Sequence, residues 1–238
     1  MGDLIVAGYP RSGNVWLSRL LGDALNRPVI GKNGAMSLAT EGRDRDNKDV
    51  VMQAHVYPVS GKQFWNGNGI DLKRREDRQF VCVVRDPRDV LVSAAAFWGW
   101  SLEETMEKMV NGPGPLDLPP WRTFMEAWFN KRIPIVRYED LCRDAEGEIG
   151  RLLAQLKLKP ENDLMHVVHR QAFKTKRADI LEHGDGYAFG KEAQLKHLRK
   201  GGTGEWHDAL PVHLKRLALT MWRRPLTILG YYQEISSC

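Results

Sequence analysis

Residues 4–14 read LIVAGYPRSGN, and this stretch decides the fold that the rest of the chain has to fit. Leu4–Gly8 is a short, apolar, branched run that ends in a turn, which is typical of a buried parallel strand. The apolar residues of Val15–Leu21 then recur at helical spacing. Glycine in the connecting turn lets the backbone bend tightly and approach a ligand closely. The order of strand, glycine turn and helix predicts an anion site on the free N–H groups of the helix start.

The turn agrees with only half of the phosphate loop that ATP-dependent enzymes use. The spacing of Gly8 and Gly13 matches the first half of that loop. Asn14 and Val15 stand where the lysine and the magnesium-binding serine or threonine would be. An ordinary strand–helix turn is the alternative that this segment alone leaves open. A site built for ATP and magnesium would lack two of its parts here.

Further apolar runs alternate with helical patterns along the chain. The expected strands are Val50–Ala54, Phe80–Val84 and Ile133–Arg137, and the expected helices are Val90–Phe97, Leu102–Val110, Trp121–Phe129, Glu146–Leu156, Asn162–His169 and Pro211–Ile228. Residues 31–48 and 58–78 are polar and rich in glycine, so we expect loops there, the second of them as a lid. This alternation predicts an α/β fold with a central parallel sheet flanked by helices, similar to the P-loop nucleotide kinases.

The composition is that of an ordinary globular protein. Its 238 residues suit a single domain over 1–238 better than two small ones. No apolar run approaches the length of a membrane span, and none near the start suits a signal peptide, so we expect a cytoplasmic protein. The cysteines Cys82, Cys142 and Cys238 form neither a disulfide framework nor a metal-ligand spacing. The formal charge of +5 suits an anionic ligand, although a solvated basic surface is the commoner explanation.

Five segments resemble, in the same order, the motifs of the PAPS-dependent, cytosolic-type sulfotransferases. Tyr9–Leu17 resembles the 5′-phosphosulfate loop, and Val83–Ser93 resembles the 3′-phosphate motif VRNPKDVxVS. Gln53–Pro58 is similar to the KTHLP segment with the catalytic histidine, Arg137–Leu141 to the YEDL strand end, and Arg199–Trp206 to RKGxxGDW. One such motif would be weak, but five in order are strong. The resemblance implies an enzyme that moves a sulfuryl group from PAPS to an acceptor hydroxyl or amine and releases PAP.

The resemblance implies two anion sites for the donor nucleotide. The 5′ site would be the loop itself, made of Arg11, Ser12, Gly13, Asn14, Val15 and Trp16. The 3′ site would combine Arg85, Ser93, Arg199, Lys200 and Gly201. The adenine would lie against Trp16, Tyr138, Gln171 and Phe173, although a core position explains Trp16 about equally well.

Two departures from the family loop affect the expected chemistry. Arg11 stands where the animal enzymes have lysine, and arginine does not give up its proton. We therefore expect Arg11 to be an electrostatic clamp on the oxygen that bridges phosphorus and sulfur. Asn14 and Val15 replace two threonines, so the hydroxyl contacts to the 5′-phosphate are lost or, at Asn14, supplied by the amide, while the backbone N–H groups would still hold the phosphate.

His55 is the expected general base. It directly follows the predicted strand Val50–Ala54, which places it at the carboxyl edge of the sheet. An imidazole titrates near neutrality and can accept the proton of an acceptor hydroxyl. The chain has seven histidines, and a lone histidine is usually structural, but the family segment around His55 favours the catalytic interpretation.

The acceptor side is less defined by the sequence. Aromatic residues crowd the segments that should face a small-molecule acceptor, namely Phe64, Trp65, Phe97, Trp98 and Trp100. They allow a pocket for an apolar or aromatic alcohol, although core packing explains most of them equally well. Core packing is the preferred interpretation for Trp121, Phe124 and Trp128.

Two other functions fit parts of the sequence. A nucleotide or small-molecule kinase would use the same scaffold, and Asn14 and Val15 argue against it. A nonenzymatic protein that binds nucleotides or RNA is the third candidate, and both His55 and the modest charge argue against it. We therefore expect neither a metal nor nucleic acid as a partner, and the sequence leaves the oligomeric state open.

Overall fold

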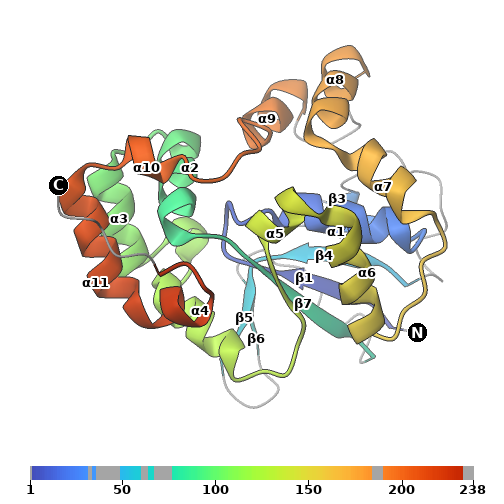
Figure 1. Ribbon diagram of the computed structural model, residues 1–238, viewed down its shortest axis with the longest axis horizontal. Helices are drawn as coiled ribbons and strands as arrows, with labels where there is room; N and C mark the ends of the chain where they lie inside the picture. Colours follow the sequence, from blue (N-terminus) through green and yellow to red (C-terminus); the bar gives the residue numbers. More distant parts are fainter. Residues whose placement is uncertain are drawn as a thin grey trace.

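The computed structural model describes residues 2–31, 34–35, 49–59, 64–66, 77–183 and 190–232. Its central sheet consists of β1 (Leu4–Ala7), β2 (Val29–Gly31), β3 (Gly34–Ala35), β4 (Val51–Ala54), β7 (Gln79–Val84) and β8 (Ile135–Arg137). The strands lie in the order β3-β2-β4-β1-β7-β8, and the neighbouring pairs are parallel except for β2 with β3 (Figure 1). The expected α/β fold with a central parallel sheet is confirmed, with one short antiparallel strand at its edge.

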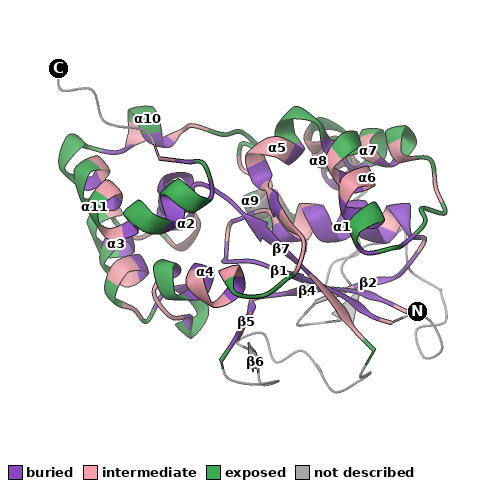
Figure 2. Ribbon diagram, turned by 60° about the horizontal axis from the view of Figure 1, so that its bottom comes forward, coloured by how far each residue is buried: buried purple, intermediate pink, exposed green. Residues whose placement is uncertain are grey.

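Helices cover both faces of this sheet, and the strands between them are buried (Figure 2). One face carries α1 (Asn14–Ala24), α5 (Tyr138–Arg143), α6 (Ala145–Gln155) and α7 (Leu164–Gln171). The other carries α2 (Pro87–Trp98), α3 (Leu102–Asn111), α4 (Trp121–Phe129), α10 (Trp206–Ala209) and α11 (Val212–Ile228). Successive side chains of a strand point to opposite faces, so Leu4 and Val6 join the first core while Ile5 and Ala7 join the second. Burial on both faces explains why β1 is apolar throughout.

Three further pieces complete the described chain. A short antiparallel pair of β5 (Val56–Pro58) and β6 (Phe64–Asn66) follows β4. The helices α8 (Phe173–His183) and α9 (Gly190–His197) lie together beyond the sheet, in orange at the top of Figure 1. A single 3₁₀ turn, η2 (Pro115–Asp117), lies between α3 and α4. Among the described residues, no helix combines the length and the apolar character that crossing a membrane would need.

The expected elements are present with small shifts at their ends, and several short ones were missed. The strands β2, β3, β5 and β6 were not expected, and β3 and β6 lie in segments that the sequence analysis assigned to loops. Most of those two segments, including the expected lid, lies outside the described residues. The residues after Arg137 were expected to end a strand, but Tyr138 begins the helix α5. The missed strands are two or three residues long and carry too few periodic positions for the sequence pattern to identify them, and the helix α8 was missed because it shows little apolar periodicity.

Candidate active site

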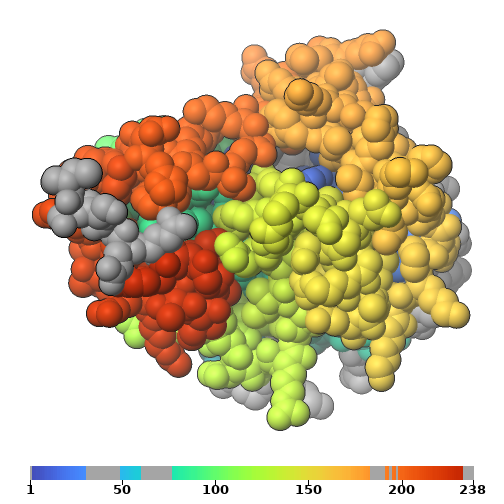
Figure 3. All heavy atoms as spheres, in the orientation of Figure 1, coloured from blue at the N-terminus to red at the C-terminus, as the bar shows by residue number. Residues whose placement is uncertain are grey.

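The functional residues gather at one edge of the sheet because parallel strands end there together. The loop with Arg11 follows β1, His55 follows β4, Arg85 follows β7, and Tyr138 follows β8. The carboxyl ends of parallel strands form the usual ligand edge of an open α/β sheet. In the space-filling view, blue atoms of the N-terminal part are visible in a hollow between the yellow-green and orange segments (Figure 3).

The loop after β1 has the backbone of an anion cradle. Gly13, the residue before α1, has φ of 100° and offers no side chain that could cap the helix. Arg11 also has positive φ, 70°, a conformation that costs a non-glycine residue about 1–3 kcal/mol and is concentrated at ligand-binding sites. A Cβ on Gly13 would lie 2.6 Å from the Tyr138 ring, so glycine is required where the loop passes this ring. The N–H groups at the start of α1 are thereby left to face a ligand.

The guanidinium groups of Arg11, Arg85 and Arg199 lie near one another at this edge. The Nε of Arg11 donates to the Oγ of Ser93 at 3.1 Å, and its guanidinium lies 4.4 Å above the Phe97 ring centroid. Burial, together with repulsion from Arg85 and Arg199, lowers the pKa of Arg11 to about 10. Arg11 still carries its charge at neutral pH. Cations that repel one another in a partly buried place are arranged to receive an anion.

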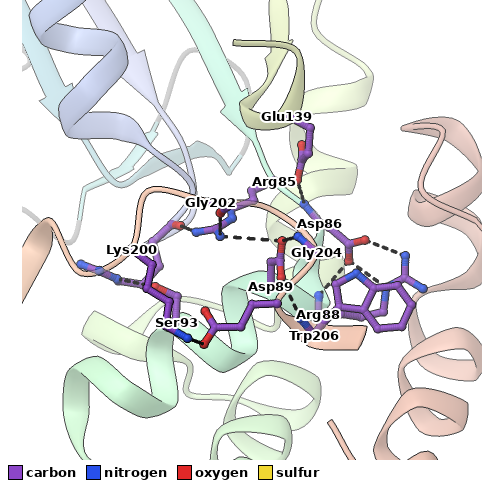
Figure 4. Close-up of polar contacts among 12 residues, drawn as sticks. Arg85, Asp86, Arg88, Asp89, Ser93, Glu139, Lys200, Gly202, Gly204 and Trp206 are labelled. Atoms are coloured by element: carbon purple, nitrogen blue, oxygen red, sulfur yellow. Dashed lines mark hydrogen bonds and ion pairs between the residues drawn. The ribbon is translucent and has the colours of Figure 1, made fainter. Parts of the chain in front are cut away.

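Arg85 joins the loop after β1 to the late loop that precedes α10. Its two terminal nitrogens donate to the carbonyl of Arg11 at 3.3 Å and to the carbonyl of Gly202 at 2.8 Å (Figure 4). Its guanidinium also lies 4.6 Å above the centroid of the Tyr138 ring. The side chain is therefore held in one place between three segments, as a specific anion ligand requires.

The late loop, residues 199–206, is held by a carboxylate that the sequence analysis missed. Asp89 accepts hydrogen bonds from the backbone N–H groups of Gly204 at 2.7 Å and Trp206 at 3.0 Å (Figure 4). Gly201 has φ of 67°, and a Cβ there would lie 2.4 Å from the Phe173 ring. The loop thus lies close to the site only with glycine at position 201.

Two cations of this loop, Arg199 and Lys200, are paired within the loop itself. Both donate to the carboxylate of Glu205, Lys200 at 2.7 Å. The hydrogen bond from Arg199, followed by that from Lys200, lowers the pKa of Glu205 to about 2. Glu205 therefore stays ionised at any working pH and holds both cations beside the site.

A second network missed by the sequence analysis supports the start of α2. Arg88 is 1% exposed, pairs with Asp86 through two hydrogen bonds of 2.9 and 2.6 Å, and lies 3.6 Å above the Trp206 ring centroid. Glu139 accepts from the backbone N–H of Asp86 at 3.0 Å and from the hydroxyl of Tyr231 at 2.5 Å. Asp86 and Arg88 lie inside the 3′-phosphate motif, so that motif could have pointed to them in the sequence.

The four residues expected around the adenine lie close to one another or to the late loop. The indole N–H of Trp16 donates to the carbonyl of Gln171 at 3.0 Å, and its ring meets the Tyr138 ring edge-on at 5.7 Å. The amide of Gln171 donates to Asp23 at 3.1 Å, a partner on α1 that sequence reasoning did not find. The Phe173 ring packs against Gly201 of the late loop. The structure thus brings Trp16 together with Tyr138 and Gln171, and it places Phe173 against the late loop.

His55 has a defined tautomer. Its Nδ1 lies 2.8 Å from the carbonyl oxygen of Gly8, and since a carbonyl can only accept, Nδ1 carries the proton. The amide nitrogen of Gln53 lies 3.2 Å from Nε2, which fits an unprotonated Nε2. Burial, chiefly, lowers the pKa of His55 to about 4; the hydrogen bond to Gly8 opposes this shift in part, and the nearby charge of Arg11 adds a smaller lowering. The imidazole is therefore neutral at physiological pH, with its lone pair on Nε2.

Several groups of the loop are already in contact with the rest of the protein. The amide of Asn14 donates to the carbonyls of Gly8 at 3.1 Å and Ala54 at 3.2 Å. The backbone N–H of Ser12 donates to the carbonyl of Tyr9 at 3.2 Å, and Val15 is half-buried. The Asn14 amide and the Ser12 N–H are thus already engaged, so a phosphate would be held by the N–H groups at the start of α1 and by Arg11.

The aromatic residues divide between the core and the rim of the site. Phe97, Trp98 and Trp100 are partly exposed, with the Trp98 and Trp100 rings stacked at 5.2 Å. The side chains of Phe64 and Trp65 lie outside the described part of the chain. The core assignment is confirmed for Trp121, Phe124 and Trp128. In the ranges that the structure describes, no group of three or more His, Cys, Asp or Glu side chains could hold a metal ion.

Comparison with known proteins gives matches of one kind. Residues 73–224 match the family model described as sulfotransferase domain. Sulfotransferase 1E1 of Cavia porcellus is 25% identical over 247 residues, which cover 89% of this chain and 79% of that protein. The crystal structure of mouse sulfotransferase SULT7A1 complexed with PAP has a TM-score of 0.70 at 15% identity and covers 98% of this chain and 89% of its own. A retinol dehydratase in complex with androsterone and inactive cofactor PAP has a TM-score of 0.64 at 15% identity, covering 94% and 80%.

Proposed function

The chain belongs to the sulfotransferase domain family, whose enzymes transfer a sulfuryl group from PAPS, and we propose that its donor binds along the carboxyl edge of β1, β4, β7 and β8. The observation that carries this proposal is the convergence of Arg11, Arg85 and Arg199 beside the glycine loop. PAPS has anionic groups at both its 5′ and its 3′ end, so it needs two neighbouring cation sites. The proposed site offers Arg11 with the start of α1 for one end, and Arg85, Ser93, Arg199, Lys200 and Gly201 for the other.

In the proposed reaction, His55 and Arg11 act on opposite sides of the sulfur. The acceptor oxygen forms a bond to sulfur while its proton passes to the Nε2 of His55. The bond between sulfur and the bridging oxygen breaks, and its electron pair stays on that oxygen, which leaves with PAP. The fixed charge of Arg11 stabilises the negative charge that grows there. The hydrogen bond of Nδ1 to Gly8 supports this proposal because it leaves Nε2 as the proton acceptor.

A small-molecule hydroxyl or amine is the proposed acceptor. Retinol dehydratase, which shares the fold, is named with androsterone, an apolar alcohol. The partly exposed Phe97, Trp98 and Trp100 support an acceptor of that apolar or aromatic kind. We further propose that residues 1–238 act as one domain, because both cores share the same sheet, and that the enzyme works in the cytoplasm.

The proposal is tested by ligand-induced stabilisation. We expect PAP to raise the melting temperature equally in EDTA and in magnesium, since a ligand that binds only the folded state stabilises it. ATP with magnesium and an RNA oligomer should do so much less. The variant Arg143→Ala, which alters a mostly exposed arginine, is the control and should respond like the wild type. Strict dependence of PAP binding on magnesium would contradict the proposal and favour a kinase.

A further inference from the structure

One backbone carbonyl, that of Gly8, accepts hydrogen bonds from two functional side chains. The Nδ1 of His55 lies 2.8 Å from this oxygen, and the Nδ2 of Asn14 lies 3.1 Å from it. Asn14 also donates to the carbonyl of Ala54 at 3.2 Å. That second carbonyl belongs to the peptide group from which His55 itself begins. Both amide hydrogens of Asn14 are therefore used on the two carbonyls next to the imidazole.

These two bonds connect β1 and β4 beyond the end of their ladder. The last paired residues of the two strands are Ala7 and Ala54, and the chains then separate into the loop after β1 and into β5. Asn14 supplies one more cross-strand connection at the point where the backbone pairing stops. This connection joins the residue before His55 to the residue at which the loop with Arg11 begins.

We propose that Asn14 is a positioning residue for the general base. It fixes the Gly8 carbonyl and the start of the His55 backbone, and thereby the ring orientation in which Nδ1 donates and Nε2 accepts the proton. The inference rests on the proposed function of His55. It departs from the expectation for the family loop, in which this position would contact the 5′-phosphate.

Two observations favour this role over simple packing. Asn14 is 3% exposed, and in the described part of the chain its Oδ1 is buried without a hydrogen-bond partner. A buried acceptor without a partner costs about 1–3 kcal/mol, which an apolar residue of similar size would avoid. In addition, a Cβ on Gly8 would lie 2.7 Å from the Asn14 Nδ2, so glycine at position 8 makes room for the amide. Burying Oδ1 without a partner is unfavourable, so the reason for an asparagine here is the two hydrogen bonds that its amide donates.

The test compares Asn14→Ala, Asn14→Asp and Asn14→Thr with the wild type. Alanine removes both donors, an ionised aspartate keeps the shape without donors, and threonine keeps one donor. Ser18→Ala is the matched control, because Ser18 is a buried polar residue of the same helix to which we assign no part in the site. We would measure PAP affinity by calorimetry, single-turnover rates against pH, and the ¹⁵N NMR signals of the His55 ring.

We expect Asn14→Ala and Asn14→Asp to lower the single-turnover rate about tenfold or more, with PAP affinity changed less than about twofold. The ring ¹⁵N signals should change from one tautomer to a mixture, and the acid limb of the rate profile should move upward in pH. Asn14→Thr should recover part of the rate. If Asn14→Ala does not fold, the rates of Asn14→Thr and Asn14→Asp are compared instead to test the role of the Asn14 donors. A tenfold loss of PAP affinity with unchanged His55 signals would make Asn14 a phosphate ligand and overturn the inference. Unchanged rates would overturn it too.

The NMR measurement separates this inference from the proposed function. It reports the His55 tautomer in the chain alone and needs no turnover. A wild type that neither binds PAP nor transfers sulfuryl groups would overturn the proposed function, whatever the ring signals show. A wild type that turns over while Asn14→Asp keeps the same tautomer and rate would overturn only the role of Asn14.

Discussion

The side chain of Arg11 donates a hydrogen bond to the Oγ of Ser93 at 3.1 Å, although the two residues are 82 positions apart. Arg11 lies in the loop after β1, and Ser93 lies in α2 after β7. The resemblance had assigned Arg11 to the 5′ end of the donor and Ser93 to the 3′ end. Their contact means that the two proposed anion sites are adjacent. A substitution in one site is therefore expected to alter ligand binding at the other.

Arg85 should discriminate donors that carry a 3′-phosphate. We expect Arg85→Ala to weaken PAPS more than adenosine 5′-phosphosulfate, because a charge-assisted phosphate contact contributes on the order of 2 kcal/mol or more. The affinities of both donors would be measured by calorimetry. The control is Arg143→Ala, since Arg143 is mostly exposed. Equal losses for the two donors would remove Arg85 from the 3′ site.

His55 should matter most for weakly acidic acceptors. We expect His55→Ala to leave PAP affinity nearly unchanged and to lower turnover by about 10² or more, the usual effect of removing a positioned base. An aliphatic alcohol needs a base more than an acidic phenol, which is already partly ionised. Single-turnover rates across phenols of graded acidity would check this. Wild-type rates with the least acidic acceptors would show that another residue takes the proton.

The pH dependence of the rate should reflect the buried state of His55. Because burial lowers its pKa to about 4, the base remains unprotonated down to about pH 5. The acid limb of the single-turnover rate should therefore lie near pH 4, and a limb near the ordinary value of about 6.5 would contradict the buried geometry. The profile would be measured with PAPS saturating, and His55→Gln serves as the control that lacks this limb.

Folding stability should respond to the same group with a definite sign. The folded pKa of His55, about 4, is below the ordinary value, so the unfolded chain binds the proton first as the pH falls. The stability contributed by the neutral ring is complete above about pH 6.5 and is lost progressively toward pH 4. Denaturant unfolding at several pH values would show a steeper loss for the wild type than for His55→Gln. Parallel curves for the two proteins would contradict this prediction.

The buried pair of Arg88 and Asp86 should be much more important for stability than an exposed pair. We expect Arg88→Met to lower the free energy of unfolding by about 3–5 kcal/mol, because it leaves the Asp86 carboxylate buried without its partner. The double variant with Asp86→Asn should recover part of this loss. Arg122→Met, which breaks the exposed pair with Glu126, should cost only about 0–1 kcal/mol. Equal losses in the two single variants would contradict the prediction.

Most strands and helices with a clear local apolar pattern were predicted correctly from the sequence. Apolar runs predicted β1, β4, β7 and β8 and the helices with a clear apolar stripe, but not α8, since this kind of periodicity needs only neighbouring residues. The short elements β5, β6 and α10 escaped detection because a few residues show no clear period. Asp89 and Arg88 escaped as well, although both lie inside a quoted motif, because each bonds to a segment more than a hundred residues further along the chain, Asp89 to Gly204 and Arg88 to the carbonyl of Tyr231.

By itself, the sequence determined the fold class, the anion loop and the family, because the loop after β1 and the four other motifs are each written in consecutive residues. The tertiary structure alone decided how those segments act on one another. Pairing β1 with β4 brings Gly8 to His55 and selects the imidazole tautomer, and it turns the Asn14 amide toward the scaffold. Pairing β1 with β7 brings Ser93 to Arg11. A hydrogen bond depends on distance and angle between atoms, and for residues far apart in the chain both are set only when the strands pair.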